Sequence, residues 1–212
     1  MPIMVTIAAV RAANPCADGL ARLLEVVGRG HAENEPIALY VPSPADVSYV
    51  LWVLCYVGGE AGSQLSQRFA CDVAEHVLPI FEARYPGDNR PRMAIETARA
   101  WLDGTATDEE RWTAWSEAID ATATADATRA AADVMGRSAT AAADAAWAAA
   151  AAADVTGRSA AVEAAVEAAA WAADAAAADA ADAAADAADA ADAARVDERR
   201  WQMDRLNQML KE

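Results

Sequence analysis

The sequence predicts an all-α fold, in which a helical bundle continues into stacked, alanine-rich antiparallel helices. Three observations lead to this class. Apolar residues recur at helical spacing, proline and glycine interrupt the apolar stretches, and alanine dominates the C-terminal half. The 212 residues are 55% hydrophobic, which excludes wholesale disorder and suits one large domain or two small ones.

Capping residues, prolines and glycines mark the expected boundaries of three helices in the first part of the chain. Thr6 is a candidate N-cap for the first helix, and Ser43 precedes the proline that opens the third. The predicted helices cover residues 6–13, 15–28 and 43–58, and a loop is expected over residues 28–42.

Three longer helices are expected next, over residues 63–85, over residues 90–104, and from Thr107 onward. The turn between the first two, residues 85–89, contains proline, glycine, aspartate and asparagine. Thr107 and Glu110 have the spacing of a capping box, which predicts where the third helix begins.

An internal repeat follows, because residues 132–139 recur 21 residues later as residues 153–160 with one substitution. Gly136 and Gly157 would each end a helix, which predicts turns between antiparallel helices. The alternative is a single uninterrupted helix, since 21 residues is close to six turns. A last helix is expected from Ser159 to about residue 210.

The segment from Val162 to Ala194 consists almost entirely of alanine and aspartate. Its aspartates fall on one side of a helix, within an arc of roughly 140°, and alanine fills the opposite side. Like charges at this spacing cost about 0.2–0.5 kcal/mol per pair, so a cationic partner would offset a real penalty. The candidate partner-binding residues are Trp171, Asp174, Asp179, Asp182, Asp186 and Asp189, and Asp192 continues the stripe.

Two alternatives to a binding face stay open. The aspartates would also serve simply to keep an alanine-rich helix soluble, or the tract would reflect codon expansion constrained only by helicity. Trp171, and Trp147 in the preceding helix, would then fill gaps between alanine helices instead of anchoring a partner.

The net charge of −16 is concentrated in the alanine-rich half, where residues 107–194 hold 17 acidic and 4 basic side chains. Such a surface repels nucleic acid and anionic membranes and attracts basic proteins. We therefore expect a protein partner, with no nucleic acid and no membrane. The composition divides the chain into an N-terminal bundle region, 1–106, and an alanine/aspartate-rich region, 107–212, packed together as one domain.

No catalytic constellation is evident, so the sequence predicts neither an enzyme nor a cofactor. Cys16, Cys55 and Cys71 lack metal-ligand spacing, and their odd number favours reduced thiols in a cytoplasm-like compartment. Asp72, Glu75 and His76 beside Cys71 form a weak metal pattern, and a half-buried structural histidine is favoured. Similarly, Arg90, Arg92 and Arg99 are expected to pair with acidic neighbours such as Asp88 or Glu96 instead of binding an anion.

Two blocks of the chain, residues 6–20 and 68–104, together resemble the immunity protein family of bacterial polymorphic-toxin systems. The matching motifs are Cys16 to Gly19, Tyr85 to Arg92, Ala94 to Arg99 and, near the C-terminus, Glu198 to Gln202. The resemblance implies an all-helical cytoplasmic protein that binds a toxin and blocks it. It does not identify the toxin or the contact residues.

The expected function is therefore stoichiometric inhibition, with the aspartate stripe engaging a basic surface such as the substrate cleft of a nuclease toxin and with Trp171 as anchor. The alternative is a self-associating helical scaffold or a surface-binding structural protein that has no toxin partner. An enzyme would rest only on His76, Cys71 and their acidic neighbours.

Overall fold

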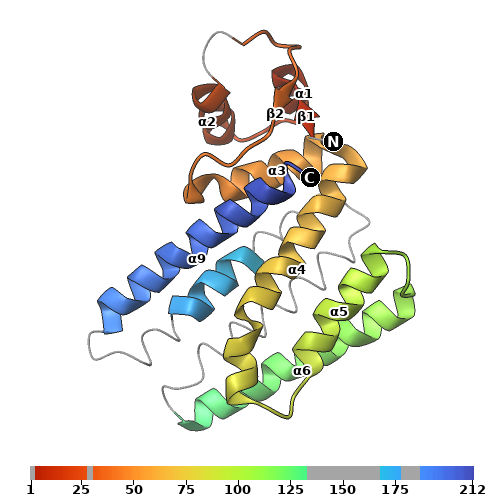
Figure 1. Cartoon of the computed structure of the whole chain (residues 1–212), viewed down its shortest axis with the longest axis vertical. Coiled ribbons are helices and arrows are strands. Elements are labelled where there is room, and N and C mark those ends of the chain that lie inside the picture. The colour runs from red at the N-terminus through yellow and green to blue at the C-terminus, as the bar shows by residue number, and fades with distance from the viewer. Residues whose placement is uncertain (1–2, 28–30, 133–167, 178–186) are drawn as a thin grey trace.

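The computed structural model describes residues 3–27, 31–132, 168–177 and 187–212, and it is predominantly helical (Figure 1). This confirms the predicted fold class. The repeat around Gly136 and Gly157 lies outside the described residues. The helices are α1 (Ile7–Ala12), α2 (Ala17–Val27), α3 (Val47–Val57), α4 (Gly59–Arg84), α5 (Arg90–Leu102), α6 (Asp108–Ala132) and α9 (Ala187–Met209), with a further helical segment over residues 168–177.

The first helix begins where the sequence predicts, α2 begins two residues later than predicted, and α3 follows a short 3-10 turn over Pro44–Asp46. The Thr6 hydroxyl accepts a hydrogen bond from the Ala9 amide at 3.1 Å and caps α1. The expected loop over residues 28–42 contains a strand that was not predicted. β2 (Ile37–Ala38) pairs antiparallel with β1 (Met4–Val5). Two residues are too few to show the alternation by which a strand is recognised in a sequence.

The helices α3 and α4 form a close hairpin at a pair of glycines. The expected helix over residues 63–85 begins four residues earlier than predicted, at Gly59, whose φ of 65° suits glycine. A Cβ atom on Gly62 would overlap the carbonyl oxygen of Leu54. The glycines thus permit a close approach of two backbones as well as a turn.

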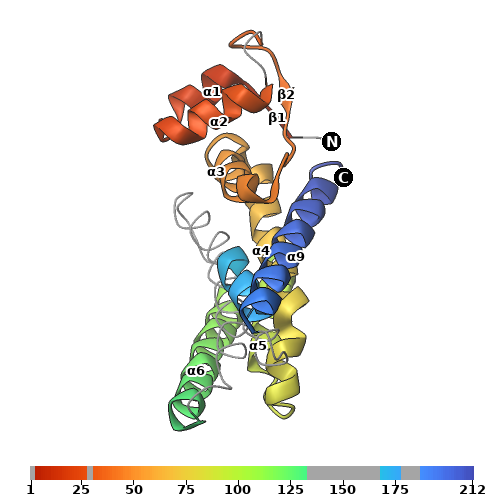
Figure 2. The same cartoon turned by 90° about the vertical axis from the view of Figure 1, so that its left-hand side faces the viewer.

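The long helix α4 lies at the centre of the molecule, with α3 and α9 against one part and the α5–α6 hairpin against another (Figures 1 and 2). Its apolar face, including the fully buried Phe69 and Phe81, forms the main core together with Leu54 of α3 and Leu206 of α9. The two N-terminal helices and the strands lie at one end, over α3 (Figure 2).

The predicted single helix from Ser159 to about residue 210 is wrong. The side-chain nitrogen of Gln202 donates a hydrogen bond to the backbone oxygen of Ala169 at 2.9 Å. In one straight helix these residues would lie about 50 Å apart, at ~1.5 Å per residue. Segment 168–177 and α9 instead lie side by side, as both views show (Figures 1 and 2).

α9 also ties the N-terminal region to the rest of the fold. The side-chain amide of Asn207 accepts a hydrogen bond from the Val41 nitrogen at 2.7 Å and donates one to the Val41 oxygen at 2.9 Å. One asparagine therefore satisfies both polar groups of a backbone unit between β2 and α3.

Candidate functional site

The structure describes part of the predicted partner-binding face, which we call the acidic face and define by the aspartates at positions 174, 179, 182, 186, 189 and 192. Asp174 lies on segment 168–177 with its side chain 61% exposed. The opposite side of this segment is buried against the fold and consists of alanine at positions 168, 169, 172, 173, 175 and 177. Within this segment, the alanine side packs inward and the aspartate points outward.

The acidic face brings together aspartates from two antiparallel helices around one arginine. Arg195 of α9 lies 3.5 Å from Asp174 and 3.1 Å from Asp192, whose side chain is 80% exposed. The antiparallel direction follows because residue 169 lies beside 202 and residue 174 beside 195. We did not expect Arg195 here, although its position three residues after Asp192 indicates the shorter of the two contacts.

Trp171 is half-buried beside Asp174 and packs against the main core. Part of the indole therefore fills space between helices, as the structural alternative expects, and part remains at the surface. Asp179, Asp182, Asp186 and Trp147 lie outside the described residues. Asp189 lies in α9, but the structure does not describe its side chain.

A polar seam, formed by the residues that join α4, α5 and α9, accounts for the weak metal pattern noticed in the sequence. Asp72 of α4 is only 9% exposed and is held at 2.7 Å by Arg99 of α5 and at 2.7 Å by Arg205 of α9. Glu75 lies 2.6 Å from the same Arg99. Both carboxylates thus face arginines, which take the place of a metal ion in neutralising them.

The same seam explains His76. Its ring stacks on the Trp201 ring with centroids 3.7 Å apart, and its Nε2 lies 3.2 Å from the buried carboxylate of Glu198. Gln202 donates a hydrogen bond to the same Glu198 at 3.0 Å. His76 therefore has a structural role, as the sequence favours, but its side chain is 40% exposed, so the prediction that it is half-buried is wrong.

The described residues contain no cluster of histidine, cysteine and carboxylates suited to a metal ion. Cys71 is fully buried, and burial raises the pKa of its thiol to about 12. Cys55 is also buried, and burial raises its pKa. Cys16 is exposed, and its sulfur accepts a hydrogen bond from the Gly19 amide at 3.3 Å. The two buried thiols are in the state expected of unreactive cysteines.

The three arginines of α5, at positions 90, 92 and 99, pair with carboxylates, as the sequence predicts, although only one uses an expected partner. Arg90 pairs with Asp88, and its hydrogen bonds hold the pKa of that carboxyl below its usual range. Arg92 pairs instead with Glu82 at 2.7 Å. Arg99 joins the seam described above. Partner choice here depends on the packing of α5 against α4, which sequence spacing does not reveal.

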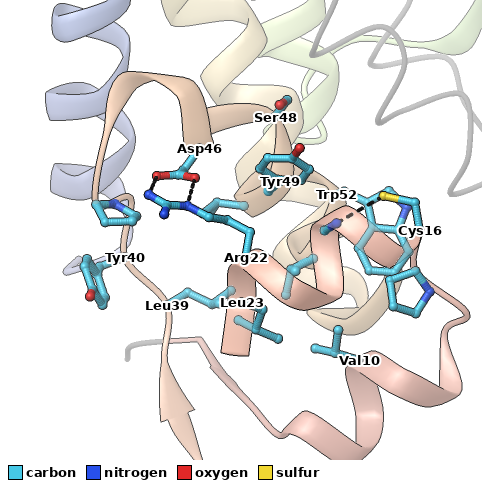
Figure 3. A pocket seen from close by; sticks show the side chains of 15 residues that line it. Val10, Cys16, Arg22, Leu23, Leu39, Tyr40, Asp46, Ser48, Tyr49 and Trp52 are labelled. Carbon is cyan, nitrogen blue, oxygen red and sulfur yellow. Dashed lines mark hydrogen bonds and ion pairs between the residues drawn. The ribbon is translucent and has the colours of Figure 1, made fainter. Parts of the chain in front are cut away.

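A pocket of about 460 Å³ lies at the other end of the molecule, between α1, α2, α3 and the chain after β2 (Figure 3). Sequence reasoning did not find it, because its walls come from four separate elements. The only charged side chains that line it are Arg22 and Asp46, which form a two-point pair at 2.7 and 3.0 Å. The residues that line this N-terminal pocket are Val10, Pro15, Cys16, Gly19, Arg22, Leu23, Leu39, Tyr40, Pro42, Asp46, Ser48, Tyr49, Val50, Trp52 and Val53.

These features define a predominantly helical, strongly acidic protein in which three buried or nearly buried carboxylates of the described residues, Asp46, Asp72 and Glu198, are engaged in structural pairs. In the described part of the chain, no helix is long and apolar enough to cross a bilayer. Residues 60–209 match the family described as "Imm-5 like putative immunity protein", and the chain belongs to this family. Searches of curated proteins and of solved structures give no significant match.

The structure gives the motifs that carried the resemblance a clear role. Arg99 from the α5 motif and Glu198, Trp201 and Gln202 from the C-terminal motif all lie in the polar seam. These motif residues hold helices together, and they do not form the exposed acidic face.

Proposed function

We propose that this protein neutralises a toxin protein by stoichiometric binding through the acidic face, with Trp171 as an anchor at its edge. Membership of the immunity family supports a toxin as the partner. The observation that carries the choice of surface is the convergence of the exposed Asp174 and Asp192 from two antiparallel helices. The net charge of −16 would attract a basic target.

The proposed mechanism is electrostatic capture followed by steric block. Acidic side chains speed the encounter with a basic surface, such as the substrate cleft of a nuclease toxin, and orient the complex. Arg195 holds Asp174 and Asp192 close together, so that two carboxylates are presented as a unit. The proposal includes a cytoplasmic location and no catalytic step.

The test titrates a candidate toxin, chosen from the products of neighbouring genes, calorimetrically at several salt concentrations. We expect one-to-one binding that weakens as salt rises. Replacing Asp174→Asn and Asp192→Asn together should weaken binding about tenfold, which corresponds to ~1.4 kcal/mol.

The matched control removes two carboxylates elsewhere, with Glu96→Gln and Glu117→Gln on the exposed side of the α5–α6 hairpin. This variant should bind nearly as well as the wild type. If binding ignores salt, or if the two double variants weaken it equally, the acidic face is not the binding surface.

Self-association through alanine faces is the competing function. Six alanines of segment 168–177, at positions 168, 169, 172, 173, 175 and 177, are already buried within the chain, which leaves them unavailable to a second copy. Light scattering during size-exclusion chromatography distinguishes the two functions. A scaffold requires an oligomer that grows with concentration, whereas a stoichiometric inhibitor does not.

A further inference from the structure

We propose that the N-terminal pocket binds an uncharged small molecule with an aromatic or alkyl body. This inference is separate from the proposed toxin-binding function, because it concerns another surface and another kind of ligand. The residues that line the pocket, between positions 10 and 53, also precede the segment that matches the immunity family.

The size and the apolar lining of the pocket indicate a small-molecule site. Val10, Val50 and Val53 line the pocket and are buried, and Leu23 and Trp52 line it and are half-buried. Ligand pockets usually measure roughly 300–1,000 Å³ and are mostly apolar. A volume of about 460 Å³ falls in this range. For comparison, a cavity of about 150 Å³ lined by apolar side chains is enough to bind benzene.

The charges at the pocket wall favour a neutral ligand. The Arg22 guanidinium donates hydrogen bonds to both carboxylate oxygens of Asp46 (Figure 3). It also donates one to Glu25 at 2.9 Å. Its positive charge is therefore already matched by two carboxylates, which leaves an anionic ligand without a counterion. A cationic ligand would have to lie next to the guanidinium. An uncharged ligand avoids both penalties.

The mouth of the pocket can accept a polar group on such a ligand. Tyr40, Ser48 and Tyr49 line the pocket and are exposed, so polar side chains occur where the lining meets solvent. Cys16 also lines the pocket and is exposed. A ligand with an apolar body and an alcohol or amide group therefore matches both the buried apolar residues and the exposed polar residues of the lining.

Gly19 of α2 offers a way to fill the pocket from its own wall. A Cβ atom at this position would lie 3.2 Å from the Cys16 sulfur and 3.4 Å from the Tyr49 ring, both of which line the pocket. Gly19→Leu should occupy the space that the ligand needs. Gly19→Ala changes the same helix position but fills little of the pocket, and it is the matched control.

The test uses the full chain and the neutral fluorescent probe N-phenylnaphthylamine. We expect saturable one-to-one binding that octanol displaces and that octanoate and octylammonium, which have the same alkyl length, displace far less. Gly19→Leu should weaken probe binding by about tenfold or more, and Gly19→Ala should retain it. Failure of the probe to bind, equal binding by both variants, or preferred binding of a charged competitor would overturn the proposal.

A second measurement needs no substitution. Iodoacetamide should alkylate Cys16 in the folded protein, and a saturating concentration of octanol should slow this reaction several-fold by filling the pocket beside the thiol. The buried Cys55 and Cys71 should remain unmodified and act as internal controls of folding. Alkylation of Cys16 at an unchanged rate would place the ligand elsewhere and overturn the proposal. Neither result depends on toxin binding.

Discussion

Residues 1–59 and residues 60–212 differ strongly in charge, although they share one fold. The first part has five acidic and three basic residues, a charge of −2, whereas the rest carries −14. The nearly neutral part contains the apolar pocket, and the acidic part contains the acidic face. The comparison teaches that one chain can present two surfaces governed by different forces. Salt screens Coulomb attraction beyond about 8 Å at physiological ionic strength, whereas apolar burial is non-directional and needs no charge.

Each part is also held together by one nearly buried carboxylate. Asp46 pairs with Arg22, 24 residues away, within the N-terminal region. Asp72 joins Arg99 and Arg205, which lie 27 and 133 residues away on two other helices. The first pair therefore stabilises a local arrangement, and the second holds distant helices together.

The largest effect is expected at Asp72. Asp72→Asn leaves Arg99 and Arg205 close together without their shared counterion and should lower the free energy of unfolding by about 2–3 kcal/mol. This is less than for a fully buried pair, because the two arginines are 32% and 29% exposed. Urea denaturation followed by circular dichroism measures the change.

The control for this prediction is Asp103→Asn, which breaks an exposed pair with Arg68 and should cost at most about 1 kcal/mol. If both variants lose the same stability, the seam does not hold α9 in place. The pairs that Asp72 makes with distant helices would then stabilise the fold no more than an exposed surface pair.

Asn207 tests the link between the two regions. Asn207→Ala removes both hydrogen bonds to Val41 and leaves the backbone groups of that residue without their partner, which should cost about 2 kcal/mol. Hydrogen exchange should speed up at the Val41 amide and in the neighbouring β2. The adjacent variant Gln208→Ala, at an exposed position, should change neither quantity appreciably. Unchanged exchange at Val41 would show that the regions are joined by other contacts.

The parts of the fold that the sequence predicts correctly are those fixed by local chemistry. Thr6 caps α1, and the Thr107–Glu110 capping box opens α6, because these hydrogen bonds join residues only three positions apart. The amphipathic pattern likewise identifies α4 and α5, although Gly59 extends α4 beyond the expected start. Local signals fix helices to within a few residues.

The features that the sequence does not reveal depend on distant contacts. Between residues 168 and 187 there is no glycine or proline to mark the end of a helix, so the contact of Gln202 with Ala169 was not foreseen. Because the tract consists almost only of alanine and aspartate, shifting one helix along its neighbour by a turn gives nearly the same contacts. The sequence therefore does not indicate which residues meet. The pairing of Arg195 with Asp174 and the assembly of the N-terminal pocket also require knowledge of which helices are neighbours.

A smaller effect is expected at Asp46. Its hydrogen bonds with Arg22 hold the pKa of this carboxyl below its ordinary value of 3.8. The ionised form is thus favoured in the folded state, and the resulting stability is present above pH 3.8 and is lost as the pH falls below it. Asp46→Asn should cost about 1.5 kcal/mol at pH 7 and less at pH 3. Thermal melts at both values test this, and an equal cost at the two pH values would contradict it.

The smallest effects are expected at the helix caps. The cap of α1 lies in the nearly neutral part of the chain and the cap of α6 in the acidic part, and the two differ in their hydrogen bonds. In α6, the Thr107 hydroxyl accepts from the Glu110 amide at 3.2 Å, and the Glu110 carboxylate accepts from the Thr107 amide at 2.8 Å. In α1, the Thr6 hydroxyl accepts a hydrogen bond from the Ala9 amide, and among the described residues no carboxylate bonds back to the Thr6 amide. Thr107→Ala should therefore cost about 1 kcal/mol and Thr6→Ala slightly less.

Thr113→Ala distinguishes capping from a general preference for alanine in helices. The Thr113 hydroxyl bonds to the Glu109 carbonyl within α6, so its removal should leave stability unchanged or slightly raised. The hydrogen bonds from Thr107 also hold the pKa of Glu110 below its ordinary value of 4.5. The advantage of the wild type over Thr107→Ala should thus shrink as the pH falls below 4.5. A pH-independent difference would mean that the carboxylate contributes nothing to the cap.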